Sequence, residues 1–220
     1  MKKQTTVITE SNNDILTGTL AKTICFYKQN KKSVWIAFVV IVLAIAGISF
    51  YANHCKQVTE NSWAAYYNAQ LSLMQDGQEA GFAQLDKVSA DFKGTPAAQY
   101  AQLLKADVLY AQENFAQAAQ VYKELVNSSN ETVATVAALS QAASLQATKD
   151  YPASINVIKT FIEKNSKSFA LPQAYLTLAM SQELAGNKAE ALEAYKYLLE
   201  NHTKTYFGTL AKDKISQLQK

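Results

Sequence analysis

Few side chains in this sequence could act as acids, bases or nucleophiles. The two histidines, His54 and His202, lie far apart in the chain. Glu190 and Glu193 are three residues apart in AEALEAYK, a spacing that places both on the solvated face of a helix. No cysteines and histidines share the spacing of a metal site, and no glycine-rich loop follows a strand. We therefore predict a non-enzymatic protein without catalytic residues, metal or cofactor.

The basic residues include no arginine, the residue type that binds phosphate best. All 21 of them are lysines, so the planar, two-pronged grip that arginine offers to phosphate and carboxylate is missing. The two cysteines, Cys25 and Cys55, flank an apolar segment and cannot form a disulfide with each other within one chain. Cys55 could bridge two chains in an oxidising compartment, although a small residue near the membrane without that role is the simpler interpretation.

The apolar segment between these cysteines, SVWIAFVVIVLAIAGISFYA, decides what the rest of the chain can do. It covers residues 33–52 without a charged residue. As a helix it would be about 30 Å long, which matches the hydrocarbon thickness of a bilayer. A cleaved signal peptide usually has a shorter apolar run that ends in small residues, whereas this run ends in Phe50, Tyr51 and Ala52. We predict one retained transmembrane helix.

The lysines predict the orientation of this helix. Residues 1–32 carry six lysines and two acidic residues, whereas residues 53–220 carry fifteen lysines and sixteen acidic residues. Because cationic residues near a span stay in the cytoplasm, we predict a cytoplasmic N-terminus and an external C-terminal part. The positive charge is confined to the short leader, so nothing indicates nucleic-acid binding. Small residues that permit close approach of another helix form a candidate docking face on the span: Ala37, Ala44 and Gly47.

The leader, residues 1–32, is mostly polar. Asn12, Asn13 and Asp14 could cap a short amphipathic helix. Its apolar residues have helical spacing: Ile15, Leu16, Leu20, Ile24 and Tyr27. Gly18 and several threonines lower the intrinsic helicity of this segment, so a disordered leader is the equally supported alternative.

The external part repeats a pattern of small and large residues. Four small residues are spaced 37, 36 and 37 positions apart: Ala69, Ala106, Ala142 and Ala179. A second small residue follows each of them after twelve positions: Gly81, Ala118, Ser154 and Ala191. A larger residue comes four positions later again: Leu85, Tyr122, Ile158 and Tyr195. This register predicts pairs of antiparallel helices whose backbones approach closely at the small residues.

The same pattern predicts the domain organisation. One helix pair cannot bury its apolar face alone, whereas four stacked pairs form a continuous core. A last helix over 205–219 has one apolar and one polar side, which is typical of the cap that ends such a stack. We predict an all-α chain with one transmembrane helix, four helix pairs and a capping helix. Its predicted parts are a leader at 1–32, the span at 33–52, a short linker at 53–62 and the repeat domain at 63–220.

The four units resemble tetratricopeptide repeats, which carry small residues at their eighth and twentieth positions and an aromatic residue at the twenty-fourth. The fourth unit matches best, with Ala179, Ala191 and Tyr195 at these positions. This sequence departs from the pattern in its longer period, in the absence of a closing proline and in polar residues at positions where apolar ones are expected. Those polar residues are Gln102, Lys105 and Gln141. The resemblance implies a tetratricopeptide-like α-solenoid that binds proteins.

The layout of the whole chain resembles the YfgM-like ancillary subunits of the SecYEG translocon. This resemblance implies a single-pass protein of the bacterial inner (plasma) membrane with a cytoplasmic N-terminus and a periplasmic repeat domain. It also implies chaperone-like (holdase) binding of unfolded exported polypeptides, and association with translocon subunits and periplasmic folding factors. The alternative is a tetratricopeptide scaffold for envelope assembly or cell division.

In tetratricopeptide proteins, ligands usually lie in a concave groove that the first helix of each pair lines at its second, fifth, ninth and twelfth positions. These positions place the following aromatic and apolar residues in the predicted partner-binding groove: Trp63, Tyr66, Leu73, Tyr100, Leu103, Tyr110, Leu176 and Met180. Polar residues share the groove: Gln70, Asp107, Gln173 and Glu183. Such a surface suits varied apolar segments, although an apolar stripe on a helix can equally face the core.

Overall fold

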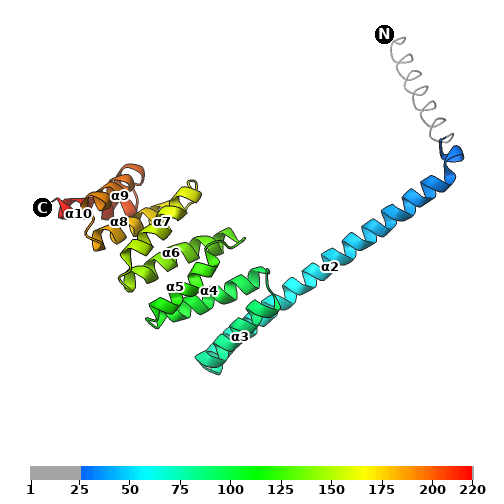
Figure 1. Ribbon diagram of the computed structural model, residues 1–220, viewed down its shortest axis with the longest axis horizontal. Coiled ribbons are helices and arrows are strands. Elements are labelled where there is room, and N and C mark those ends of the chain that lie inside the picture. Colours follow the sequence, from blue (N-terminus) through cyan, green and yellow to red (C-terminus); the bar gives the residue numbers. More distant parts are fainter. Residues whose placement is uncertain (1–25, 220) are drawn as a thin grey trace, which may run out of the picture. The chain divides into compact units, whose positions relative to one another are not determined.

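The computed structural model of this chain describes residues 26–219, which are helical and contain no strand (Figure 1). The predictions for Cys25 and for the leader helix before Phe26 lie outside the described residues. The chain divides into two units, Met1–Gln57 and Val58–Lys220, and the second unit holds all the repeats. The predicted all-α fold is confirmed.

The first labelled helix, α2 (Lys31–Gln75), contains the predicted span. It is long and apolar enough to cross a membrane, and the side chains of its apolar segment are exposed instead of packed into a core. The helix continues without a break through residues 53–62, where we predicted a linker. That segment contains neither glycine nor proline, the residues that most readily stop a helix. The division of α2 into span and linker stays a prediction.

The helices that follow α2 pair in chain order (Figure 1). The first repeat joins the end of α2 to α3 (Gln78–Asp91), and the second joins α4 (Pro96–Ala111) to α5 (Phe115–Leu125). The third repeat joins α6 (Glu131–Ala147) to α7 (Tyr151–Lys164). The fourth joins α8 (Leu171–Leu184) to α9 (Lys188–Asn201), and α10 (Tyr206–Leu218) follows. The four predicted helix pairs are therefore confirmed.

The repeats form a stack in which contacts stay local. Each helix from α3 to α9 packs against the helix that follows it in the chain, and the first helices of successive repeats also touch, α4 with α6 and α6 with α8. Helix α10 packs against α9 and α8, so it takes the place that the first helix of a further repeat would occupy. This arrangement confirms the predicted capping helix.

The small residues of the repeat pattern lie where the helices approach most closely. At most 1% of the surface of each first-helix alanine is exposed, at Ala69, Ala106, Ala142 and Ala179. The second-helix residues Ala118, Ser154 and Ala191 are fully buried. At Gly81 the approach is so close that an added Cβ would lie 2.7 Å from the Cα atom of Leu73. The regular spacing of small residues in the sequence therefore marks the positions where the helices pack against each other.

The turn inside each repeat contains one residue in the left-handed backbone region. Gly77 and Gly186 adopt it without steric cost, whereas Glu113 (φ 62°) and Lys149 (φ 64°) adopt it while carrying a side chain. In the last three repeats, the next residue donates its backbone N–H to the carbonyl five positions earlier. These hydrogen bonds join Asn114 to Leu109, Asp150 to Leu145 and Asn187 to Gln182. A shared turn geometry thus keeps the repeats alike.

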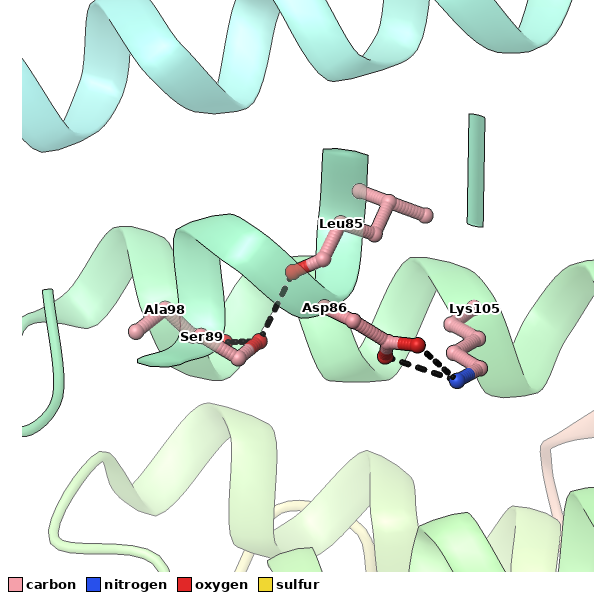
Figure 2. Close-up of polar contacts among 5 residues, drawn as sticks. All are labelled: Leu85, Asp86, Ser89, Ala98 and Lys105. Atoms are coloured by element: carbon pink, nitrogen blue, oxygen red, sulfur yellow. Dashed lines mark hydrogen bonds and ion pairs between the residues drawn. The ribbon is translucent and has the colours of Figure 1, made fainter. Parts of the chain in front are cut away.

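Lys105 shows how a polar residue is accommodated where the repeat pattern expects an apolar one. Figure 2 shows its ammonium group beside Asp86 of α3, with both carboxylate oxygens at 2.7 Å. Nearby, the Ser89 hydroxyl lies 3.0 Å from the carbonyl oxygen of Leu85 and 3.2 Å from that of Ala98. These polar contacts connect α3 to α4 across the boundary between the first two repeats.

Candidate protein-binding groove

Three of the predicted groove residues meet at the boundary between the first two repeats. Trp63 and Tyr66 come from α2, and Tyr100 comes from α4. The ring centre of Trp63 lies 5.7 Å from that of Tyr66, edge to face, and 5.6 Å from that of Tyr100. The Gln70 amide donates a hydrogen bond to the Tyr66 hydroxyl at 3.2 Å. This aromatic cluster, Trp63, Tyr66 and Tyr100, keeps 40% of Trp63 exposed while ring contacts orient it.

Asp107 places a carboxylate close to the aromatic cluster. Tyr122 of α5 donates its hydroxyl to this carboxylate at 2.6 Å. Burial raises the pKa of Asp107 above its ordinary value and outweighs the opposite effect of that hydrogen bond. The pKa of Tyr66 is raised by burial and further by the negative charge of Asp107. Within residues 26–219 Asp107 forms no ion pair, so this end of the groove combines aromatic rings with one uncompensated negative charge.

Glu183, at a polar groove position of the fourth repeat, is engaged by the surrounding helices. The Tyr195 hydroxyl of α9 donates to its carboxylate at 2.8 Å, and the Lys214 ammonium of α10 lies 2.9 Å away. Burial, and then the hydrogen bond to Glu183, raise the pKa of Tyr195. Glu183 thereby ties the capping helix to the fourth repeat, which is a structural role.

Two predicted groove residues belong to the core. Leu103 of α4 is 8% exposed and Leu176 of α8 is 6% exposed, and both pack in hydrophobic core clusters. Their side chains are therefore not available to a ligand, because the fifth position of these two helices faces the protein interior. Leu73 is half-buried and packs directly on Gly81 of α3.

The remaining predicted residues are accessible but do not join the aromatic cluster through a ring contact. Tyr110 is 37% exposed at the end of α4 and packs on Phe115, with 5.0 Å between ring centres. Met180 is 40% exposed on α8. The candidate docking residues Ala37, Ala44 and Gly47 lie on the exposed apolar part of α2, and their role stays a prediction.

The third repeat contributes a groove residue that the sequence reasoning missed. Val136 of α6 is 37% exposed and lies six positions before Ala142, just as Trp63 lies six positions before Ala69. This constant offset from the small residue was the signal that could have found it. Accessible apolar side chains thus occur on the first helices of all four repeats, at Trp63, Tyr110, Val136 and Met180.

The histidine, cysteine and acidic side chains show no grouping typical of a metal site in the described part of the chain. Among residues 26–219, no three histidine, cysteine, aspartate or glutamate side chains are grouped so that they could hold a metal ion. His54 lies on α2 in the first unit and His202 directly after α9 in the second. The aromatic cluster and the Asp107 carboxylate can contact a bound protein segment, which is a means of recognising it.

Comparisons with known proteins agree with the helix-pair architecture. A family model described as a tetratricopeptide repeat-like domain matches residues 25–170. A crystal structure of TPR-like repeats from a protein of Podosopora anserina, described as a kinesin light chain, aligns with a TM-score of 0.55 and 13% identity over 73% of this chain and 86% of that chain.

A variant of the same Podosopora anserina protein aligns with a TM-score of 0.56 and 12% identity over 73% of this chain and 85% of that chain. At such low identity this likeness supports the fold alone. No curated protein matches the sequence. Because the family model covers more than half of the residues and the repeats are present in the fold, this chain belongs to the tetratricopeptide repeat-like domain family.

Proposed function

We propose that this protein is a membrane-anchored, non-enzymatic binding module that acts as an ancillary subunit of a bacterial SecYEG translocon and holds unfolded segments of exported polypeptides. Tetratricopeptide-like repeats are typically scaffolds that bind other proteins, which supports the general part of this proposal. The resemblance of the chain layout to YfgM-like translocon subunits supports the specific part.

The observation that carries the proposal is the accessible aromatic surface at the first two repeats. Trp63 is held by Tyr66 and Tyr100, so a bound apolar segment would contact a ring that is already oriented and loses little conformational freedom. Val136 and Met180 extend this surface with smaller and more adaptable side chains. A surface of this kind tolerates varied apolar sequences, as a holdase requires.

The predicted anchor supports a position beside a membrane channel. If residues 33–52 span the inner membrane with the lysine-rich leader inside, the repeat domain lies in the periplasm. Tethering to the same membrane raises the effective concentration towards a channel to roughly the millimolar range without any new contact. Ala37, Ala44 and Gly47 are the residues that we propose for close contact with a channel helix.

Photocrosslinking in cells tests the proposed partners. A photoreactive amino acid replaces Trp63 or Tyr110, and as a control Tyr206, which is 71% exposed on the capping helix. We expect the groove positions to capture translocon subunits, periplasmic folding factors and nascent exported chains, and Tyr206 not to do so. Capture of one defined envelope or division protein would favour the scaffold function instead. No capture from either groove position would refute the groove assignment.

A purified system tests the groove itself. The full chain in lipid nanodiscs is titrated with a fluorescent, permanently unfolded model polypeptide. Replacing Trp63, Tyr66 and Tyr110 together by alanine should weaken binding at least about tenfold, since aromatic anchors dominate such interfaces. The matched control is Tyr206→Ala, and circular dichroism confirms that both variants are folded. Unchanged binding by a folded triple variant would contradict the proposed binding surface.

A further inference from the structure

A cavity of about 240 Å³ lies between the second and third repeats, away from the aromatic cluster. Its walls come from α5, α6 and α7, so it opens among the second helices of two repeats and the buried side of α6. None of the predicted groove residues lines it. It is therefore a separate site, independent of the function proposed above.

The unusual feature of this cavity is Gln141. The repeat pattern expects an apolar residue at its position, and only 6% of Gln141 is exposed. Within residues 26–219 its side-chain amide makes no hydrogen bond to another residue, although the side chain lines the cavity. Its amide atoms are not sealed in the core, because no fully buried side-chain N or O atom of the described residues lacks a partner. The remaining exposed part of Gln141 therefore includes its amide, which is accessible to a molecule in the cavity.

Two other glutamines of the same chain, one buried and one half-buried, show that the fold can satisfy such groups. Gln182 is 3% exposed, and its side-chain oxygen accepts a hydrogen bond from Asn187 at 2.7 Å. Gln146 donates to the Ser181 hydroxyl at 2.7 Å. Gln141 lacks such a partner, which leaves its donor and acceptor for a group inside the cavity.

The charges around the cavity define what that group could be. Lys123 and Lys164 contribute two ammonium groups to the lining, which contains no acidic residue. Neither lysine forms an ion pair within the described part of the chain. An adjoining cavity shares Lys164 and contains one carboxylate, Glu131, so a second negative charge would be disfavoured on that side. The site therefore suits a single negative charge.

Apolar side chains, Val126, Val157 and Phe161, line the same space together with Ala138 and the uncharged polar residues Asn127, Asn156, Thr160 and Asn165. We propose that this cavity binds a carboxylate that carries an apolar side chain, with Lys123 and Lys164 supplying positive charge and the Gln141 amide donating a hydrogen bond. A cavity of this size holds about one amino-acid residue and not a long segment. Such a carboxylate occurs at the end of a polypeptide chain and in small branched-chain acids.

The test uses the full chain in lipid nanodiscs and the probe N-acetyl-leucine, with N-acetyl-leucinamide as the uncharged analogue. We expect the acid, and not the amide, to give saturable chemical-shift changes by NMR at millimolar concentration. A peptide that ends in leucine and the free acid 4-methylpentanoate then distinguish a chain end from a small metabolite. Equal binding of acid and amide, or no saturable binding of either because the cavity takes only water, would overturn the proposal.

Variants locate the binding to this cavity. Lys123→Gln and Lys164→Gln change exposed side chains and should each weaken binding of N-acetyl-leucine about tenfold. The matched control, Lys196→Gln, alters an exposed lysine on α9 outside the cavity and should leave binding unchanged. Gln141→Leu should also weaken the binding, because it removes the proposed hydrogen-bond donor. Full binding in both lysine variants would refute the site whether or not Gln141→Leu folds.

Discussion

Replacement of Gly81 by alanine separates what the sequence pattern predicts from what the structure predicts. The equivalent positions of the other repeats hold Ala118, Ser154 and Ala191, so the pattern alone predicts that alanine is tolerated. In the structure, a Cβ atom at Gly81 would collide with the side chain of Leu73 and lie 2.7 Å from its Cα atom. The first repeat is packed more tightly than the others at this position, so alanine should destabilise it.

Two opposing effects set the magnitude. Overpacking of a core contact costs about 1–3 kcal/mol, and the upper value applies because a backbone atom of Leu73 cannot rotate away. Alanine in place of glycine inside a helix returns about 1 kcal/mol through helix propensity. The net loss of unfolding free energy is therefore about 2 kcal/mol. For a domain of this size, that loss lowers the melting temperature by about 4–8 °C.

Thermal unfolding of the full chain in detergent, followed by circular dichroism at 222 nm, measures this change. The matched control is Ala83→Gly on the exposed face of α3, which should lose about 1 kcal/mol through helix propensity alone. Hydrogen exchange of α3 amides then shows whether the loss is local to the first repeat. An unchanged or raised melting temperature for Gly81→Ala would refute the inferred close packing.

Two further predictions concern pH and turn geometry. The raised pKa values of Tyr122 and Tyr195 mean that the folded chain keeps protons that the unfolded chain releases near pH ~10. The stability that these residues provide is complete below pH ~10 and declines above it. In urea unfolding, the unfolding free energy of the original chain should therefore fall more steeply above pH ~10 than that of the variant with Tyr122→Phe and Tyr195→Phe. An equally steep fall in both proteins would contradict this. Glu113→Gly and Lys149→Gly should each raise the unfolding free energy by about 0.5–1 kcal/mol by removing left-handed strain, whereas Gly186→Ala should lower it by about 1 kcal/mol. Lower melting temperatures for both Glu113→Gly and Lys149→Gly than for the original chain would contradict this prediction.

The repeat architecture could be predicted because its determinants are local and periodic. The small residues recur at a nearly constant spacing, and each of them has to lie at a helix contact, as Ala106 and Ala142 do. The division between groove and core within one helix could not be predicted in the same way. Tyr100 and Leu103 lie three residues apart on the same side of α4, and the packing of the neighbouring repeat decides which of them stays accessible.

Two other features could not be predicted from the pattern of residue types alone. The uninterrupted course of α2 follows from the absence of a helix-breaking residue at 53–62, which the interpretation as a linker did not consider. Gln141 was recognised as a departure from the repeat pattern. Its unpartnered position beside a cavity, however, depends on the side chains that α5 and α7 bring to it from other parts of the sequence.

The local contacts of the stack also determine how the domain responds to tension. Within the described helices, no contact joins the first repeat to the fourth. One repeat can therefore separate from its neighbours without breaking contacts between distant parts of the domain. Under a pull between α2 and the C-terminal end, the domain would lengthen by one helix pair at a time, each releasing 36 or 37 residues. At about 3.5 Å per extended residue, each step would add roughly 120 Å of contour length. The solenoid would thus extend under force in discrete steps, one helix pair at a time, while the other pairs stay folded.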